Sequence, residues 1–278
     1  MVPLYEAKMM QQYDHRFGDG SVLLARPQNT GWPKPCETDL ADPDFEVGPW
    51  YWVPEDEVKL RYLDQGWNRR WTINWRRSAR AGDERTLISS VVPAFGIGDN
   101  LFTALPDQLP SKLACFLASW NSLVVDFCLR QKAGGANMSY FLIEQLPILP
   151  PTAYDEAALA FIVPRVLELT YTSHSMAPLA RDLGYEGQPF AWDEDRRAHL
   201  RAELDAWYAL AYGLTRDELR YVLDPRDVMG EDYPSETFRV LQKNEIARHG
   251  EYRTRRLVLA AYDELTAQGM RPRVEGYR

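Results

Sequence analysis

Apolar residues recur at helical spacing in the second half of the chain. Between residues 193 and 212, Leu200, Leu204, Trp207 and Tyr208 form one stripe at intervals of three and four, preceded by Asp193 and followed by a glycine. Such a stripe, with an acidic N-cap and a glycine stop, is typical of an amphipathic helix. Similar patterns predict helices over 155–170, over 215–223 and over 251–267, the second opened by a capping box. We therefore expect residues 151–278 to form a helical region.

The first 150 residues follow a different pattern. Short runs of β-forming residues occur at 50–53, 71–75 and 86–92, and proline and glycine interrupt the intervals between them. One stretch, 111–130, has the apolar spacing of a long helix. The acidic residues after Pro54 suit the first turn of a helix. The chain is therefore predicted to be an α+β protein, with a mixed-sheet domain and one long helix in residues 1–150 and a helical region in residues 151–278.

Composition excludes several classes of protein. The 278 residues are 45% hydrophobic and 26% charged, which indicates a globular chain of one or two domains. No apolar run approaches the roughly 18 residues of a membrane span, and the N-terminus lacks the layout of a signal peptide. The sequence thus predicts a cytoplasmic protein. Its three cysteines and four histidines are scattered without ligand spacing, so no metal site is predicted.

The net charge of −8 argues against binding nucleic acid through bulk charge, but cations gather locally. Seven arginines lie between residues 61 and 85, among Trp67, Trp71 and Trp75: Arg61, Arg69, Arg70, Arg76, Arg77, Arg80 and Arg85. Arginines among aromatic residues can neutralise phosphates and contact bases. The alternative is a pair of strands whose tryptophans face the core and whose arginines face solvent.

A second candidate site is the stretch from Gln131 to Phe141, which joins Lys132 to the adjacent glycines Gly134 and Gly135. Glycines let the main chain approach a phosphate closely, permit positive φ angles that aim successive N–H groups at one anion, and lie here beside a cation. The alternative is a glycine C-cap that ends the predicted helix.

Two stretches of the sequence partly match catalytic patterns. Residues Phe95-Gly-Ile-Gly98 superficially resemble the loop that holds S-adenosylmethionine, but two prolines follow, and Leu149 stands where a methyltransferase catalytic motif needs a polar residue before Pro150-Pro151. We expect a turn at 95–98. Asp44, Glu57 and Lys59 fit the loose spacing of a magnesium-dependent nuclease, which stays an alternative.

Several short stretches, read in order, resemble the C-terminal target-recognition region of adenine-N6 DNA methyltransferases of the Type IIG restriction-modification kind and related phage-defence methylases. The matching stretches span nearly the whole chain: Pro3 to Arg16, Tyr51 to Pro54, Glu84 to Ser89, Asn121, Gln131 to Gly135, Tyr140-Phe141, Gln145 to Pro151 and Gly250 to Arg256. The family's catalytic domain, expected before Met1, is absent from this sequence. The chain is therefore expected to be half of a split enzyme, a truncated reading frame or an isolated region.

The resemblance implies a sequence-recognition module that grips double-stranded DNA and presents a flipped adenine to a methyltransferase catalytic domain or subunit. It implies no catalytic residue and no cofactor in this chain, with S-adenosylmethionine bound by the missing half. The expected DNA-binding residues fall in three groups: Lys8, His15 and Arg16; Arg69, Arg70, Arg76, Arg77 and Arg85; and Lys132, Gly134, Gly135 and Asn137. A stand-alone nuclease and a non-enzymatic interaction protein are the alternatives.

Overall fold

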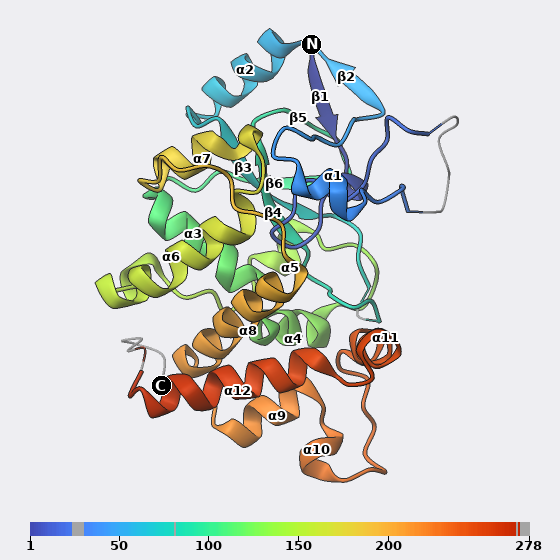
Figure 1. The fold of residues 1–278 in the computed structure, drawn as a ribbon, viewed down its shortest axis with the longest axis vertical. Coiled ribbons are helices and arrows are strands. Elements are labelled where there is room, and N and C mark those ends of the chain that lie inside the picture. The colour runs from blue at the N-terminus through green and yellow to red at the C-terminus, as the bar shows by residue number, and fades with distance from the viewer. Residues whose placement is uncertain (24–30, 81, 271, 273–278) are drawn as a thin grey trace. The chain divides into compact units, whose positions relative to one another are not determined.

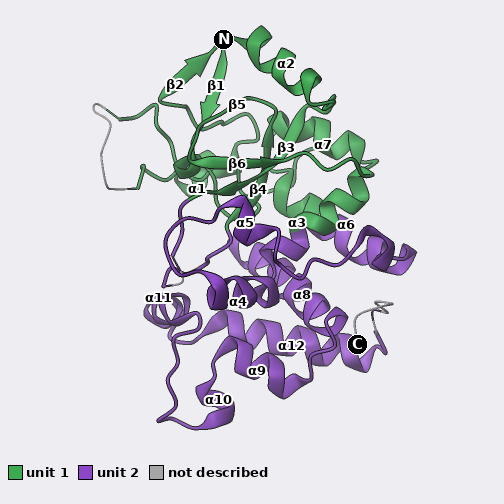
Figure 2. Ribbon diagram, turned by 180° about the vertical axis from the view of Figure 1, so that it is seen from behind, with its two compact units in different colours: residues 1–77, 88–117, 166–192 green, residues 78–87, 118–165, 193–278 purple. Residues whose placement is uncertain are grey.

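The computed structural model describes residues 1–23, 31–80, 82–270 and 272. The chain divides into two compact units that interleave along the sequence (Figures 1 and 2). Unit 1 comprises Met1–Arg77, Ile88–Leu117 and Val166–Trp192, and unit 2 comprises Ser78–Leu87, Ala118–Arg165 and Asp193–Arg278. These units are defined by contacts. The resemblance implies a different division, into a DNA target-recognition domain at 1–150 and a helical region at 151–278 that braces or docks it, and this stays a prediction.

Unit 1 contains two small sheets. The strands are β1 (Val2–Tyr5), β2 (Tyr51–Val53), β3 (Trp71–Arg76), β4 (Ser89–Pro93), β5 (Gly96–Ile97) and β6 (Leu101–Ala104). One sheet, ordered β2-β1-β5, is mixed, because β1 runs antiparallel to β2 and parallel to β5. The other, ordered β4-β3-β6, is wholly antiparallel. With the helices below, these sheets confirm the predicted α+β class.

The core of unit 1 gathers around the N-terminal segment. Tyr5, Met9 and Met10 are buried there with Trp32 and Val92. The unit also contains short helices and parts of two longer ones: η1 (Ala7–Met9), α1 (Glu37–Ala41), α2 (Glu55–Asp64), η3 (His174–Met176), α7 (Ala177–Asp182), most of α3 (Pro110–Asn121) and the end of α6 (Glu156–Thr170). Helix α2 begins after Pro54 with three acidic residues, as the sequence predicts.

Unit 2 is helical. Besides the larger part of α6 it contains α4 (Leu123–Lys132), α5 (Tyr140–Ile143), η2 (Pro151–Ala153), α8 (Glu194–Ala211), α9 (Arg216–Leu223), α10 (Arg226–Met229), α11 (Arg239–His249) and α12 (Arg253–Ala267). Helices α8 and α12 pack side by side (Figure 1). The predicted N-cap Asp193 accepts two main-chain N–H bonds, and Thr215 and Glu218 form the predicted capping box. The sequence pattern did not predict α11, because no residue of this helix is buried and it has no apolar stripe.

Two local predictions are wrong. The helix predicted over 111–130 is two helices, α3 and α4, because Ser122 adopts an extended conformation and its hydroxyl caps α4 by accepting the Val125 N–H. Residues 95–98 are not a plain turn, since Gly96 and Ile97 form β5 beside β1. A Cβ at Gly96 would lie 2.6 Å from Val53 Cγ2, so close strand packing explains the glycine there.

Among the described residues, no single helix is long and apolar enough to cross a membrane, although α3 and α4 reach that length and composition when taken together as a bent pair.

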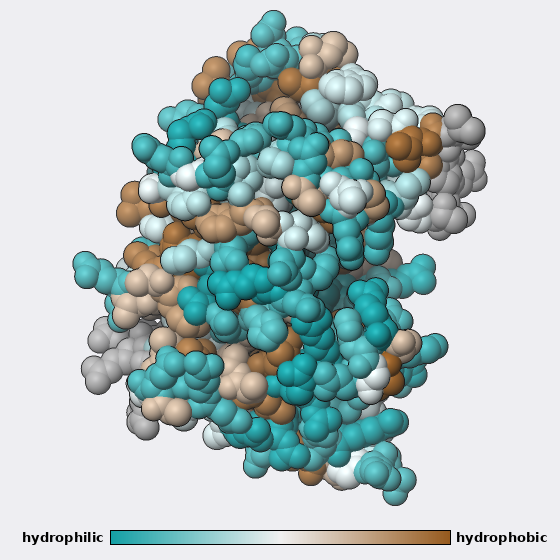
Figure 3. Space-filling model, viewed as in Figure 1, coloured by the Kyte–Doolittle hydropathy of each residue, from teal (hydrophilic) through white to brown (hydrophobic). Residues whose placement is uncertain are grey.

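The face of α11 and α12 visible in Figure 3 is mostly hydrophilic.

Candidate nucleic-acid interface

The loop that contains the adjacent glycines Gly134 and Gly135 follows the C-terminus of α4 in unit 2. Ala133 caps the helix with an extended backbone, so neither glycine serves as a left-handed C-cap, and that alternative is wrong. Gly134 and Gly135 are also outside the positive-φ region, which corrects our expectation of a nest built on such angles. Both are exposed, and a Cβ at either would meet no heavy atom within 4 Å. The fold of the chain therefore does not itself require glycine at these positions.

The loop is fixed by its neighbours on both sides. Asn137 forms a β-bridge with Ser78, and the Ala79 N–H donates to Ala136 O at 3.0 Å. Met138, the next residue, is fully buried and anchors the loop to unit 2. A polar, glycine-rich segment is thus held in one place while its backbone stays open to solvent.

Charged and aromatic side chains surround this loop. Arg80 and Lys132 are exposed beside it, and Tyr140 and Phe141 on α5 are 47% and 73% exposed. We call these residues the glycine-loop surface: Arg80, Lys132, Gly134, Gly135, Asn137, Tyr140 and Phe141. It combines two cations, accessible main chain and two aromatic rings, which are the groups that contact phosphates, sugars and bases.

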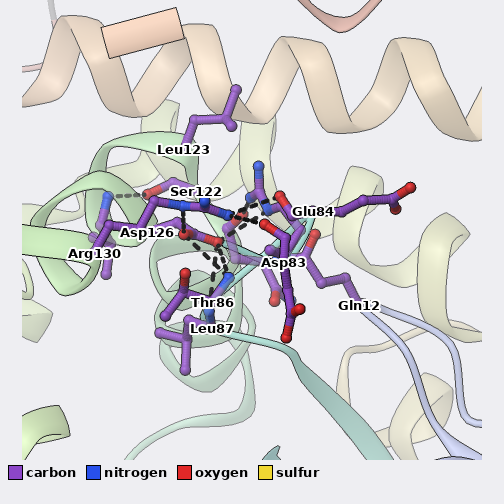
Figure 4. A network of polar contacts seen from close by, with 12 residues as sticks. Gln12, Asp83, Glu84, Thr86, Leu87, Ser122, Leu123, Asp126 and Arg130 are labelled. Atoms are coloured by element: carbon purple, nitrogen blue, oxygen red, sulfur yellow. Dashed lines mark hydrogen bonds and ion pairs between the residues drawn. The ribbon is translucent and has the colours of Figure 1, made fainter. Parts of the chain in front are cut away.

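A buried carboxylate holds the helix that carries this surface. Asp126 is fully buried in α4, and its oxygens accept from the Thr86 N–H at 3.0 and 3.2 Å (Figure 4). Arg130 Nε donates to Asp126 at 2.8 Å, and Arg85 Nε lies 3.3 Å from the same carboxylate. Two guanidinium groups and main-chain N–H donors satisfy this carboxylate. Asp126 therefore connects α4 to the segment that precedes β4.

Arg85, predicted to bind DNA, belongs to this buried network. Its guanidinium donates to Asn121 O, and its side chain is 12% exposed. Arg85 and Arg130 both lie against the ring of Phe238, at 5.7 and 4.4 Å from its centroid. We therefore leave Arg85 out of the proposed contact residues and assign it to positioning α4.

The N-terminus of α4 is held by Asp205 of α8. Asp205 is 7% exposed, and its carboxylate accepts from the Leu123 N–H at 2.7 Å. Burial raises the pKa of Asp205 to about 6, although Arg85 and the Leu123 N–H both act to lower it. Asp205 is thus a second polar anchor for the helix that carries Lys132.

In unit 1, the predicted arginines before β3 line a hollow of about 380 Å³ between the loop that precedes β3 and helix α7. We call it the arginine hollow; its lining residues are Asn68, Arg69, Arg70, Pro178, Arg181 and Asp182. Arg69 lies within 6 Å of the Trp67 and Trp71 rings, donates to Gln108 O and lies 3.6 Å from Asp182. Arg70 and Arg181 are exposed.

The strand that follows does not offer side chains to a groove. Residues Trp71 to Trp75 are all buried, so β3 is covered on both faces, and the tryptophans are core residues as the alternative reading held. Arg76 donates to Met10 O and lies over the Phe17 ring, which makes it a support for the N-terminal loop. Arg77 is half exposed and lies 3.8 Å from Asp99.

The three predicted contacts near the N-terminus are also in unit 1. Lys8 is half-buried in η1. His15 is buried, with Nε2 2.9 Å from Ser173 Oγ. The Arg16 guanidinium, wholly buried, donates to the carbonyl oxygens of residues 40, 42, 45 and 172. Side chains so placed reach no phosphate without local unfolding, so we leave His15 and Arg16 out of the proposed contact residues.

The residues of the nuclease alternative are engaged elsewhere in unit 1. Asp44 lies 3.9 Å from His174, Glu57 pairs with Arg61, and Lys59 pairs with Glu55. Within the described part of the chain, no group of three or more His, Cys, Asp or Glu side chains could hold a metal ion.

Comparison with known proteins found no matching family model, no matching curated protein and no matching solved structure.

Four side chains that lie beside the candidate residues were not predicted as contact residues from the sequence. Arg181 follows Arg70 by more than 100 residues, and only the fold brings them to one hollow. Arg80 is one of the seven arginines between residues 61 and 85, and Tyr140 and Phe141 form a stretch that carries the resemblance, but the sequence does not show that these side chains are exposed. Of the twelve predicted residues, five are exposed and have no side-chain role in a buried network: Arg70, Lys132, Gly134, Gly135 and Asn137, the last of which forms a main-chain β-bridge with Ser78.

Proposed function

We propose that the chain is the DNA sequence-recognition module of an adenine-specific DNA methyltransferase of a restriction-modification or phage-defence system. It would grip double-stranded DNA, while a partner polypeptide supplies the catalytic domain and binds S-adenosylmethionine. Such a module would work in the cytoplasm. The proposal rests on the resemblance and is supported above all by the glycine-loop surface.

The strongest support is that Gly134 and Gly135 have no role within the chain's own fold. Neither adopts positive φ, and neither is packed against another atom that a side chain would displace. Two adjacent glycines free of both constraints leave the main chain open to close approach by another molecule. Lys132 provides the charge that favours a phosphate there, and Phe141 provides an exposed ring beside it.

The test is binding of a fluorescent random-sequence DNA duplex, followed by anisotropy over a range of salt concentrations. We expect affinity to fall steeply with salt, and Lys132→Ala to reduce the slope of log K against log salt by about 0.9, as for one lost phosphate contact. Lys243→Ala, an exposed lysine on α11 of the same unit, is the matched control and should leave the slope unchanged.

A second pair of variants tests the glycines themselves. Gly134→Ala with Gly135→Ala should weaken duplex binding by hindering backbone approach, and should not lower the unfolding free energy because the added methyl groups meet open space. Gly31→Ala, also in open space but in unit 1 and outside the glycine-loop surface, is the control. Absence of salt-dependent duplex binding, or wild-type affinity in the glycine variant, would refute the proposed role.

A further inference from the structure

We propose that the arginine hollow of unit 1 is a phosphate-binding site in which Arg70 and Arg181 contact the anion. This goes beyond the proposed function, because it assigns a site for a phosphate group that can be measured without DNA. The ligand chemistry is a phosphoryl group, whether in the DNA backbone or in a free phosphorylated molecule.

The charge of the hollow supports this assignment. Three arginines and one aspartate line it, and the aspartate is already engaged: Asp182 accepts from Trp71 Nε1 at 2.8 Å and lies 3.6 Å from Arg69. Arg70 and Arg181 form no ion pair or side-chain hydrogen bond with any other described residue. The lining thus keeps two uncompensated positive charges in a chain whose net charge is −8.

The neighbouring acid does not cancel this charge. Arg70 contributes to lowering the pKa of Glu55, but the larger causes are the hydrogen bond and charge of Lys59, whose Nζ lies 2.5 Å from that carboxylate. The charge of Glu55 is therefore compensated by Lys59 rather than by Arg70. The guanidinium of Arg70 remains available as a planar pair of donors, the geometry that suits phosphate oxygens.

The hollow is also held in shape by its walls. Arg69 lies within 6 Å of the Trp67 and Trp71 rings, and Trp67 Nε1 donates to Trp71 O at 2.8 Å. Trp71 Nε1 and Arg69 both contact Asp182, and these contacts join β3 and the loop before it to α7, which Figure 1 shows beside β3. Arg69 is accordingly a positioning residue, and Asn68 adds an exposed amide to the rim. The volume of about 380 Å³ is large enough for a phosphate group together with part of the molecule that carries it.

The experiment measures inorganic phosphate binding to the full chain by calorimetry at low ionic strength. We expect saturable binding in the wild type and at least about a tenfold weaker binding in Arg70→Ala with Arg181→Ala, because each removes a charge-assisted contact. Lys34→Ala with Arg61→Ala removes the same charge from exposed positions of unit 1 outside the hollow, and should bind phosphate as the wild type does. No saturable binding, or equal binding in both double variants, would overturn the site.

Duplex DNA then distinguishes the source of the phosphate. One outcome is that Arg70→Ala with Arg181→Ala also reduces the slope of log K against log salt for duplex binding by the amount expected for about two lost phosphate contacts. In that case the hollow holds a phosphate of the DNA backbone. If phosphate binding is lost while duplex binding is unchanged, the ligand is a free phosphorylated molecule. A chain that binds phosphate but no DNA at all would refute the proposed function and leave this site standing.

Discussion

Asp205→Asn should remove a pH-dependent loss of stability from unit 2. Burial raises the pKa of Asp205 from 3.8 to about 6, so between these values the folded chain holds a proton that the unfolded chain has released. The stabilisation from this carboxyl is therefore present in acid and is lost as the pH rises through 6. Linkage over a pKa difference of this size gives a loss of about 1.4 kcal/mol between about pH 5 and pH 8.

The assay is urea unfolding of wild type and variant across this pH range. The asparagine Oδ1 can still accept the Leu123 N–H, so the anchor of α4 is kept while the titration is removed. We expect the variant to gain stability relative to wild type as the pH rises. Asp232→Asn, at an exposed position of unit 2, should show no such trend. If the difference between wild type and Asp205→Asn is the same at both ends of the range, the carboxyl does not titrate as argued.

Two further substitutions probe the packing that positions the two surfaces. Asp126→Ala should cost about 3–5 kcal/mol in urea unfolding, because it leaves two buried guanidinium groups without their shared carboxylate; a cost below about 1 kcal/mol would show the network to be dispensable. Gly96→Ala should destabilise unit 1 by about 1–3 kcal/mol, since its methyl group would overlap Val53. Thermal unfolding compared with Gly82→Ala checks this, and equal midpoints would contradict it.

The sequence predicts those elements whose signals are local. Asp193 and the Thr215–Glu218 pair mark helix starts by side-chain bonds to the adjacent main chain, and both helices begin there. The split between α3 and α4 escaped prediction because the apolar stripe continues through Ser122, whose cap competes with the helix only through two hydroxyl bonds.

The candidate site was predictable only in part, for a physical reason. A sequence shows which residues are charged but not which charges are already satisfied. Arg16 and Arg85 are buried against carbonyl oxygens and a carboxylate, whereas Arg70 is exposed, and nothing in the local sequence separates these environments. The open glycines could be named in advance, but the exposure of Phe141 depends on tertiary packing.

The buried guanidinium of Arg16 has a consequence for the order in which the protein forms. One of its acceptors is Thr172 O, 156 positions later, and Trp71 likewise reaches Asp182. On the ribosome, the N-terminal segment must wait for this late stretch of chain before the last of the Arg16 acceptors is in place. A fragment ended at residue 150 would lack that acceptor and the partner of Trp71, so dissection of the molecule should keep residues 166–192 with the first segment.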